Sequence, residues 1–498
     1  MAISNLFAAG TFAATRQSDR LQTLRSDLAD LNRQLATGQR HETLGAMRRG
    51  RSAVLDMRGD LGALDGFRAV AQRGGVRIGL MNDALGQIGT LAGQARKDAL
   101  TAGAPALPGA IGSAVSTARV RLDLAISQLN TDIDGQYLFS GRATTTVPVL
   151  PLNTILNGAG GAAGLSTLID ERRQADRGDG MGRLSLGVAG TSVSLGEEAA
   201  GLPFGFKLSA ASTTSGAITT SGPAGSPAAI SFGITGPVQA SETLAVDLTL
   251  PDGSRERLTL TAQAGPAIGA GSFAIGADAA ATAANIGAAL GTLVRERADT
   301  ALAAASSMVA ADDFFAGSAS TPPRRIAGPP LATATGFAAA GSRPTVAWYQ
   351  GDDDAAVSAR GSQLATIDRG VTLGTGARAN EGALRKVLAG LAVVAAEPAG
   401  GSVARFQALT WRSAGALAPD SDPAVSTMTT ELSTAHSAMS AAETRHASRS
   451  AMLQGALGDI EQPSIEELSA SILALQTRLQ ASYQVTASLS KLSLANYL

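Results

Sequence analysis

Residues 21–38 read Leu-Gln-Thr-Leu-Arg-Ser-Asp-Leu-Ala-Asp-Leu-Asn-Arg-Gln-Leu-Ala-Thr-Gly, and this stretch decides how the ends of the chain fold. The leucines recur at alternating steps of three and four, which is the a/d heptad pattern of a coiled-coil seam. The leucines of this seam are Leu21, Leu24, Leu28, Leu31 and Leu35. Gly38 is typical of a helix C-terminus. We therefore expect a helix that ends there and needs a partner for its leucine stripe.

The same pattern returns at the other end of the chain. Ser464-Ile-Glu-Glu467 follows Pro463 and has the form of a capping box, which predicts the start of a helix. The apolar positions after it complete the predicted assembly seam, and they are Ile465, Leu468, Ile472, Leu475, Leu479, Leu489 and Leu492. An isolated amphipathic helix is marginally stable in water. Both ends of the chain are therefore expected to pair with something.

The sequence between the two ends changes in character. After the helix that ends at Gly38, helical periodicity predicts a second helix from about residue 53 to 100 and a third from about 115 to 133, with Pro105 and Pro108 between these two. From about 147 to 344 the chain is rich in Gly, Ala, Ser, Thr and Pro, and the helical period fades. This middle region is expected to be rich in β-strands.

Local patterns predict particular elements within the middle region. Alternating apolar residues at 244–250, the turn Pro251-Asp-Gly-Ser254 and further leucines at 258 and 260 predict a β-hairpin. Residues 184–195 alternate like short strands, and residues 278–302 predict an alanine-rich helix. The expected fold class is α+β, with the N- and C-terminal helices pairing into an elongated coiled-coil or bundle core and a β-rich domain inserted in the middle.

These patterns predict three domains, in line with a length of 498 residues, for which about three domains are usual. Residues 1–40 with 460–498 form the terminal coiled-coil region. Residues 41–146 with 345–459 form a helical core domain, and residues 147–344 form the inserted outer domain.

The composition excludes several classes of function. There is no cysteine and there are only three histidines, which excludes disulfide scaffolds, thiolate metal sites and cysteine nucleophiles. The 40 Lys+Arg and 41 Asp+Glu residues nearly balance, which argues against nucleic-acid binding. No apolar run has the roughly 20 residues that a membrane span needs, and no basic residue precedes Arg16, so a cleavable signal peptide is not expected.

The two arms differ in charge. Residues 1–100 hold 13 Arg and one Lys against nine acids, a net +5, whereas residues 421–498 hold four basic and seven acidic residues, a net −3. Opposite charges favour pairing of the arms, but exposed ion pairs contribute at most about 1 kcal/mol each. The apolar seam is expected to supply most of the energy, at roughly 1.5–3 kcal/mol per buried side chain.

A search for chemical sites finds four short motifs, and each has a plainer interpretation. Gly374-Thr-Gly-Ala-Arg-Ala379 follows a stretch expected as one strand, residues 365–373, and fits a dinucleotide-binding fingerprint. No βαβ pattern surrounds it, however, and a flexible strand-to-helix turn is favoured. Glu443 and His446 are half of a di-iron motif whose second copy is missing, so a solvated helix face is favoured. Asp352-Asp-Asp354 lacks the ligand spacing of a calcium loop and is interpreted as a solvated turn. Arg177-Gly-Asp179 supports no adhesion function. We therefore predict no catalytic residue, no cofactor and no metal, and hence no enzyme.

Several stretches resemble the flagellin superfamily. Asp30-Leu-Asn-Arg-Gln-Leu-Ala-Thr-Gly-Gln-Arg40 is similar to the end of its N-terminal helix, and Gly135-Gln-Tyr-Leu-Phe-Ser-Gly141 to the end of its third helix. Trp348-Tyr-Gln-Gly-Asp352 resembles a strand that precedes the C-terminal helices, and the ending Leu492-Ser-Leu-Ala-Asn-Tyr-Leu498 is closest to the hook-associated protein 3 branch. The resemblance covers roughly 1–145 and 345–498. The acidic element that usually follows the first glycine is missing, because His41 to Arg49 read His-Glu-Thr-Leu-Gly-Ala-Met-Arg-Arg.

The resemblance implies a structural subunit of the bacterial flagellum, an adaptor at the hook–filament junction. It implies secretion to the extracellular flagellum through the export channel without cleavage of a signal peptide. The implied partners are further copies of the chain, the hook-side junction protein, flagellin and an export chaperone, with no nucleic acid and no membrane insertion. A filament-forming flagellin is the alternative, and a surface adhesin or carbohydrate-binding protein acting through the middle domain is a second one.

Overall fold

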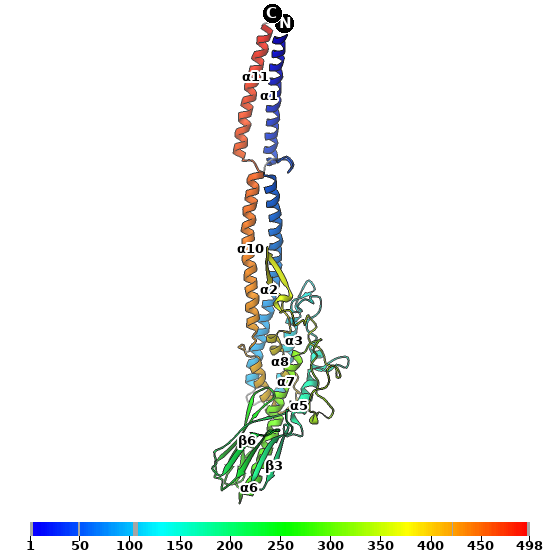
Figure 1. The fold of residues 1–498 in the computed structure, drawn as a ribbon, viewed down its shortest axis with the longest axis vertical. Coiled ribbons are helices and arrows are strands. Elements are labelled where there is room, and N and C mark those ends of the chain that lie inside the picture. Colours follow the sequence, from blue (N-terminus) through cyan, green and yellow to red (C-terminus); the bar gives the residue numbers. More distant parts are fainter. Residues whose placement is uncertain (1–2, 48–49, 103–107, 421, 496–498) are drawn as a thin grey trace. The chain divides into compact units, whose positions relative to one another are not determined.

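A computed structural model describes residues 3–47, 50–102, 108–420 and 422–495 (Figure 1). It confirms a mixed α and β fold. The helices are α1 (Ile3–Thr37), α2 (Arg51–Ala102), α3 (Pro108–Leu129), α4 (Leu152–Asn157), α5 (Leu165–Arg177), α6 (Ala279–Arg297), α7 (Ala303–Ala316), α8 (Gly382–Ala395), α9 (Val403–Ala416), α10 (Val425–Glu461) and α11 (Ile465–Ala495). A π-helical turn, η1 (Ala298–Leu302), and two 3₁₀ turns, η2 (Leu331–Thr333) and η3 (Arg360–Ser362), complete the helical elements described.

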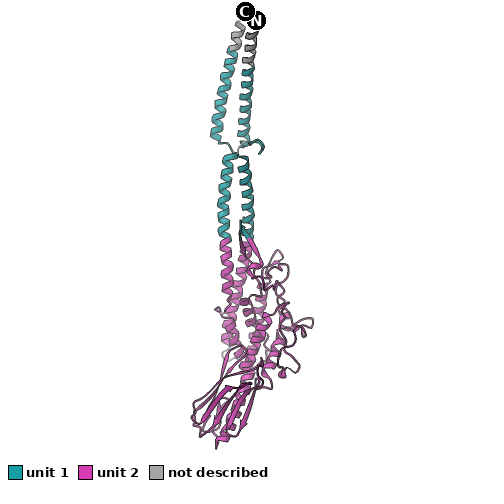
Figure 2. Cartoon of the chain, viewed as in Figure 1, with its two compact units in different colours: residues 1–73, 366–371, 439–498 teal, residues 74–365, 372–438 magenta. Residues whose placement is uncertain are grey.

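The strands are short. They are β1 (Asp132–Ile133), β2 (Gln136–Tyr137), β3 (Leu184–Ala189), β4 (Ser192–Glu197), β5 (Lys207–Thr213), β6 (Ile218–Ala224), β7 (Ala229–Ile234), β8 (Thr243–Thr249), β9 (Arg255–Gln263), β10 (Ser272–Ala274), β11 (Leu364–Asp368) and β12 (Val371–Gly374). The chain divides into two compact units (Figure 2). The first comprises residues 1–73, 366–371 and 439–498, and the second comprises residues 74–365 and 372–438.

In the first unit, α1 and α11 lie side by side and run antiparallel. Gln17 Nε2 donates to Thr486 Oγ1 at 3.1 Å, and Arg25 Nε donates to Tyr483 Oη at 2.9 Å. As the residue number rises along α1 it therefore falls along α11. Figure 1 shows the pair as blue and red helices.

The helix α1 ends, and the helix α11 begins, where the sequence predicts. The helix α1 ends at Thr37 because Gly38 adopts a φ of 66°, and the Gly38 N–H closes the last turn on Gln34 O at 2.8 Å. At the start of α11, the Ser464 hydroxyl accepts from the N–H of Glu467 at 3.3 Å, as in the predicted cap.

In the second unit, helices α3, α7, α8 and α9 pack together, and α5 packs on α7. Residues 383–384 and 387–395 of α8 are all buried, which is why its sequence is almost wholly apolar. The predicted third helix is shorter than expected. It ends at Leu129, and Ile133 lies in strand β1, paired with Gln136 of β2. Pro108 is the first residue of α3, whereas Pro105 lies outside the described residues.

The β-rich part of the second unit consists of two four-stranded sheets and α6. Their strand orders are β10-β9-β8-β5 and β3-β4-β7-β6, and all neighbours are antiparallel except β10 and β9. One apolar core contains side chains from both sheets and from α6, including Phe232, Leu260 and Ile286. The predicted hairpin is confirmed as β8–β9 and the predicted short strands as β3–β4. Asp278 caps α6 by accepting from the N–H of Ala281 at 2.7 Å.

Two segments differ from the strands expected of them. Residues 348–352 form no regular strand. Instead Trp348 and Tyr349 are fully buried, and Tyr349 makes an isolated bridge to Val149. The stretch expected as one strand before the glycine motif folds back on itself as the hairpin β11–β12, because Gly370 adopts a φ of 76° between the two strands.

Candidate functional site

The predicted assembly seam is only partly covered within one chain. Leu468 and Leu479 are buried at 4% and 6% exposure. Most other members are half-buried, and these are Leu21, Leu24, Leu28, Leu31, Ile472 and Leu475. Leu35 and Ile465 are exposed, at 47% and 70%. The side chains of Leu489 and Leu492 lie outside the described part of the structure.

A small apolar cluster lies where α1 is followed by α2 and where α10 is followed by α11, and it joins the N-terminal and C-terminal segments of the chain. The Arg40 N–H donates to Glu461 O at 2.7 Å, next to the three-residue connection between α10 and α11. Met47, Val54 and Leu457 are buried there in one apolar cluster. This cluster includes residues of the segment 41–49, where the sequence departs from the flagellin pattern.

The tip of the hairpin β11–β12 is held against the first unit's helices by His446. The imidazole is 3% exposed, its Nε2 lies 2.7 Å from Ile367 O, and its ring stacks on Phe67 with centroids 5.8 Å apart. Beside it, Arg369 and Asp60 form an ion pair of 2.7 Å. The interpretation of His446 as a residue on a solvated face is therefore wrong, since a segment about 80 residues earlier covers it.

The Glu443–His446 motif does not form a metal site. The Glu443 carboxylate accepts from Gln72 Nε2 at 2.7 Å, while His446 bonds the hairpin. Among the residues that the structure describes, no group of three or more His, Asp or Glu side chains could hold a metal ion.

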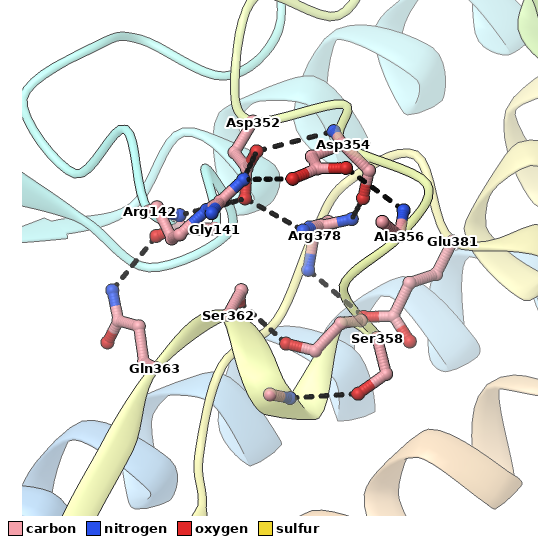
Figure 3. A network of polar contacts seen from close by, with 12 residues as sticks. Gly141, Arg142, Asp352, Asp354, Ala356, Ser358, Ser362, Gln363, Arg378 and Glu381 are labelled. Atoms are coloured by element: carbon pink, nitrogen blue, oxygen red, sulfur yellow. Dashed lines mark hydrogen bonds and ion pairs between the residues drawn. The ribbon is translucent and has the colours of Figure 1, made fainter.

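In the second unit, two residues of the acidic triplet, Asp352 and Asp354, take part in a network with two arginines (Figure 3). Arg142 binds Asp352 through Nε and Nη2 at 2.9 and 3.0 Å, and its Nη2 also contacts Asp354 at 2.7 Å. Arg378 approaches Asp352 from another chain segment, with Nη2 2.7 Å from Oδ2. The hydrogen bond from Arg142 is the main reason why the pKa of Asp352 falls to about 2.

This network joins three segments that are far apart in the sequence. The N–H of Asp352 donates to Ser140 O at 3.0 Å, and the N–H of Ala379 donates to Phe139 O at 2.8 Å. The side chain of Asp352 is 10% exposed and that of Arg378 is 7% exposed. Asp352 is thus neither a free ligand for a cation nor part of a solvated turn, because two arginines already neutralise its charge.

The glycine motif at 374–379 is packed against the same network, and the backbone at its two glycines lies close to residues 359–363. The N–H of Gly376 donates to Arg360 O at 3.1 Å, and a Cβ on Gly376 would lie 2.1 Å from Ser362 Oγ. Arg360 also pairs with Glu381 at 2.8 Å, and burial raises the pKa of Glu381. The motif does connect a strand, β12, to a helix, α8, as predicted. Because Ala377, Arg378 and Ala379 are buried, however, this turn is packed into the structure and is not the flexible turn expected.

The remaining motif and one cavity suggest no reaction. Arg177 forms an ion pair with Asp299 at 2.6 Å, and Asp179 accepts from the N–H of Met181 at 3.2 Å, so both ends of the Arg-Gly-Asp triplet have intramolecular partners. A cavity of about 530 Å³ lies between α2, α3, α8 and α9, with a mostly apolar wall. Its charged residues include Asp98 and Arg121, which pair with each other at 2.6 Å.

Comparisons with protein-family models, curated proteins and solved structures find no match for this chain. Within its described residues, no helix is both long and apolar enough to cross a membrane.

Proposed function

We propose that this chain is a structural subunit of the bacterial flagellum, an adaptor at the hook–filament junction that assembles through its terminal helices and catalyses no reaction. The partly open seam carries this proposal. Leu468 and Leu479 are covered within the chain, whereas Leu35 and Ile465 stay exposed. A subunit that must add neighbours along the same apolar stripe needs such a partly covered surface.

The finer architecture belongs to this proposal. The terminal helices would pair as a coiled coil, and residues 147–344 would be an outer insertion. The antiparallel contacts of α1 and α11 support the first point. The second is supported by hydrogen bonds where the segment leaves and returns, since Leu150 N–H donates to Trp348 O at 3.0 Å and Gln350 N–H donates to Pro148 O at 2.8 Å.

Contact between two of the family-like motifs also supports the proposal. The stretch 135–141 and the stretch 348–352 are about 210 residues apart, yet Tyr349 Oη donates to Phe139 O at 3.4 Å. Phe139 and Trp348 are both 0% exposed. Two motifs that resemble one family thus form one buried contact, as expected if they are inherited together.

The proposed route and partners follow from the same resemblance. The chain would leave the cell unfolded through the flagellar export channel, without signal cleavage, and would bind an export chaperone beforehand. In the flagellum it would contact its own copies, the hook-side junction protein and flagellin. The absence of cysteine from the sequence suits a chain that is threaded unfolded and assembled outside the cell.

The test is incorporation into hook–basal bodies in the bacterium that makes this protein. Deleting residues 475–498, or replacing Leu479 with Asp, should abolish incorporation, since a buried unpaired charge is costly. Val188→Asp is the matched control, because Val188 is 46% exposed on β3 of the β-rich part. Normal assembly of the truncated chain would refute the proposal.

Two measurements address the alternatives. Immunogold labelling of isolated hook–basal bodies should place a few copies at the distal end of the hook, whereas labelling along whole filaments would favour a flagellin. A glycan array probed with the full chain tests a carbohydrate-binding middle region, and saturable binding to a defined glycan would favour that function.

A further inference from the structure

A small cavity in the second unit is lined by cations. It has a volume of about 220 Å³ and lies between residues 322–325 and residues 338–345. Three of its lining residues are arginines, Arg324, Arg325 and Arg343. No residue that lines it in the described part of the chain is acidic. The proposed function makes no use of this cavity.

One carboxylate behind the wall serves two of these arginines. Glu171 Oε1 accepts from Nη2 of both Arg325 and Arg343, the latter at 2.5 Å, and Oε2 accepts from Arg325 Nε at 2.9 Å. The side chains of Glu171 and Arg325 are 6% and 9% exposed. Two guanidinium groups that share one carboxylate leave one positive charge without a counter-charge.

The third arginine adds to this excess. The guanidinium of Arg324 lies 4.2 Å from the centre of the Phe337 ring, and among the described residues it has no ion pair within 4.0 Å. Asp313 is an acidic group that interacts with it at longer range, and Asp313 also interacts with Arg172, the partner of Asp176 at 2.7 Å. Counting Arg172 with the three lining arginines against Glu171, Asp176 and Asp313 gives four positive and three negative charges.

The walls of the cavity are held in place before any ligand arrives. Pro323 and Pro344 have fixed φ angles. The Thr345 hydroxyl donates to Pro323 O at 3.1 Å, which ties the two segments together, and Arg343 Nη1 donates to Ile326 O at 2.7 Å. A pocket that is already ordered loses little conformational entropy on binding.

We propose that this cavity binds a small anion: a phosphate, sulfate or carboxylate group, either free or carried by a molecule no larger than a monosaccharide. Guanidinium groups match such oxyanions in geometry and stay charged at all physiological pH values. The size limit follows from the volume, since sites for drug-sized ligands measure roughly 300–1,000 Å³. This inference stands independently of the flagellar function.

Calorimetric titration of the full chain in low-salt buffer tests the proposal, with inorganic phosphate, sulfate and glucuronate as probes and glucose as the neutral control. At least one anion should bind with one site per chain, and glucose should not bind. Arg324→Gln should weaken the binding by about threefold to tenfold, while Arg324→Lys should retain most of it. Arg324 is exposed, so Arg324→Gln should lower the melting temperature only slightly, through the lost contact with Phe337, and Arg324→Lys should change it less.

Arg255→Gln is the matched control, because Arg255 is an exposed arginine on β9 that does not line the cavity, and it should bind like the wild type. Tighter binding of glucuronate than of the inorganic ions would identify an anionic sugar as the source, and the reverse order would identify a free oxyanion. The proposal is overturned if no anion binds at about 10 mM, the weak end of specific affinities. Equal binding by Arg324→Gln and the wild type would also overturn it.

Discussion

The two units of this chain bury their side chains to very different extents. In the second unit Phe139, Phe314, Phe315 and Trp348 are at most 1% exposed, and charged side chains such as Asp352 are neutralised inside the structure. In the first unit, no described side chain of α1 is buried, and the described part of α11 buries Leu468 and Leu479. Since helix stability in proteins comes mainly from packing, the second unit should hold its fold by itself, whereas α1 and α11 should depend on what binds them.

Removing the buried Trp348 from the second unit should cause the largest loss in the free energy of unfolding, and it tests whether this unit has a tight core. Trp348→Ala should lower the free energy of unfolding by about 3–5 kcal/mol, because a large cavity forms and an indole hydrogen bond is lost. That bond runs from Nε1 to Phe315 O at 3.1 Å. Trp411→Ala is the matched control, since Trp411 is 73% exposed, and it should cost little. Urea unfolding followed by circular dichroism measures both; equal losses would mean that Trp348 is not part of a tight core.

Disrupting the arginine–aspartate network should cause the next largest loss in the free energy of unfolding. Asp352→Ala should lower the free energy of unfolding by about 2–3 kcal/mol, because it leaves the buried Arg378 without its carboxylate. Asp353→Ala is the control in the same turn, where the carboxylate bonds Ser320 at 2.8 Å at the surface. If the two variants unfold at the same urea concentration, the network is not a stabilising feature of the second unit.

The same carboxylate predicts a dependence of stability on pH. The pKa of Asp352 is lowered from 3.8 to about 2 by its arginine partners, so the folded chain binds its proton less readily than the unfolded chain does. Its contribution to stability should therefore be complete above about pH 4 and be lost as the pH falls toward 2. Urea midpoints measured across this range should fall more steeply for the wild type than for Asp352→Asn. Parallel curves would contradict the assignment.

A smaller and more local loss is expected in the first unit. His446→Ala should cost about 1–3 kcal/mol, because it removes the stacking on Phe67 and leaves Ile367 O without its partner. Hydrogen exchange at the amides of residues 366–371 should speed up in this variant. His436→Ala is the control, because His436 is exposed, and it should leave the exchange of these amides unchanged. Unaltered exchange in the His446 variant would show that the hairpin tip is held by other contacts.

The terminal pair should show the smallest effect on the isolated chain. Leu479→Asp places a charge at a 6% exposed position, whereas Leu473→Asp does so at a 66% exposed position on the same helix. Hydrogen exchange in α1 and α11 should speed up for the first variant alone, and the urea midpoint of the second unit should stay the same, since local unfolding need not spread. A lower midpoint for Leu479→Asp would show that the two units unfold together.

Features set by neighbouring residues could be predicted from the sequence. The end of α1 at Gly38, the hairpin β8–β9 and the cap at Ser464 each depend on residues a few positions apart, whose conformations are decided locally. The mixed fold class followed from the same patterns.

Contacts between distant segments could not be predicted in this way. Asp352 looks like part of a solvated turn until Arg142, about 210 residues earlier, is placed against it. His446 lies on a helix whose pattern gives no sign that a hairpin covers it. At the predicted seam, Leu35 and Ile465 fit the heptad spacing as well as Leu479 does, so spacing alone could not tell covered from exposed positions.

The interruption between the helices of the first unit has a mechanical consequence. One side of the chain breaks between Thr37 and Arg51, the other between Glu461 and Ile465, and the Arg40–Glu461 hydrogen bond links the two breaks. Each helix already ends there, at Gly38 on one side and before the cap Ser464 on the other. Bending the chain at this level strains no hydrogen bond within a helix, whereas bending within a helix lengthens the bonds on its outer side. We therefore expect curvature imposed on the chain to concentrate at these two breaks.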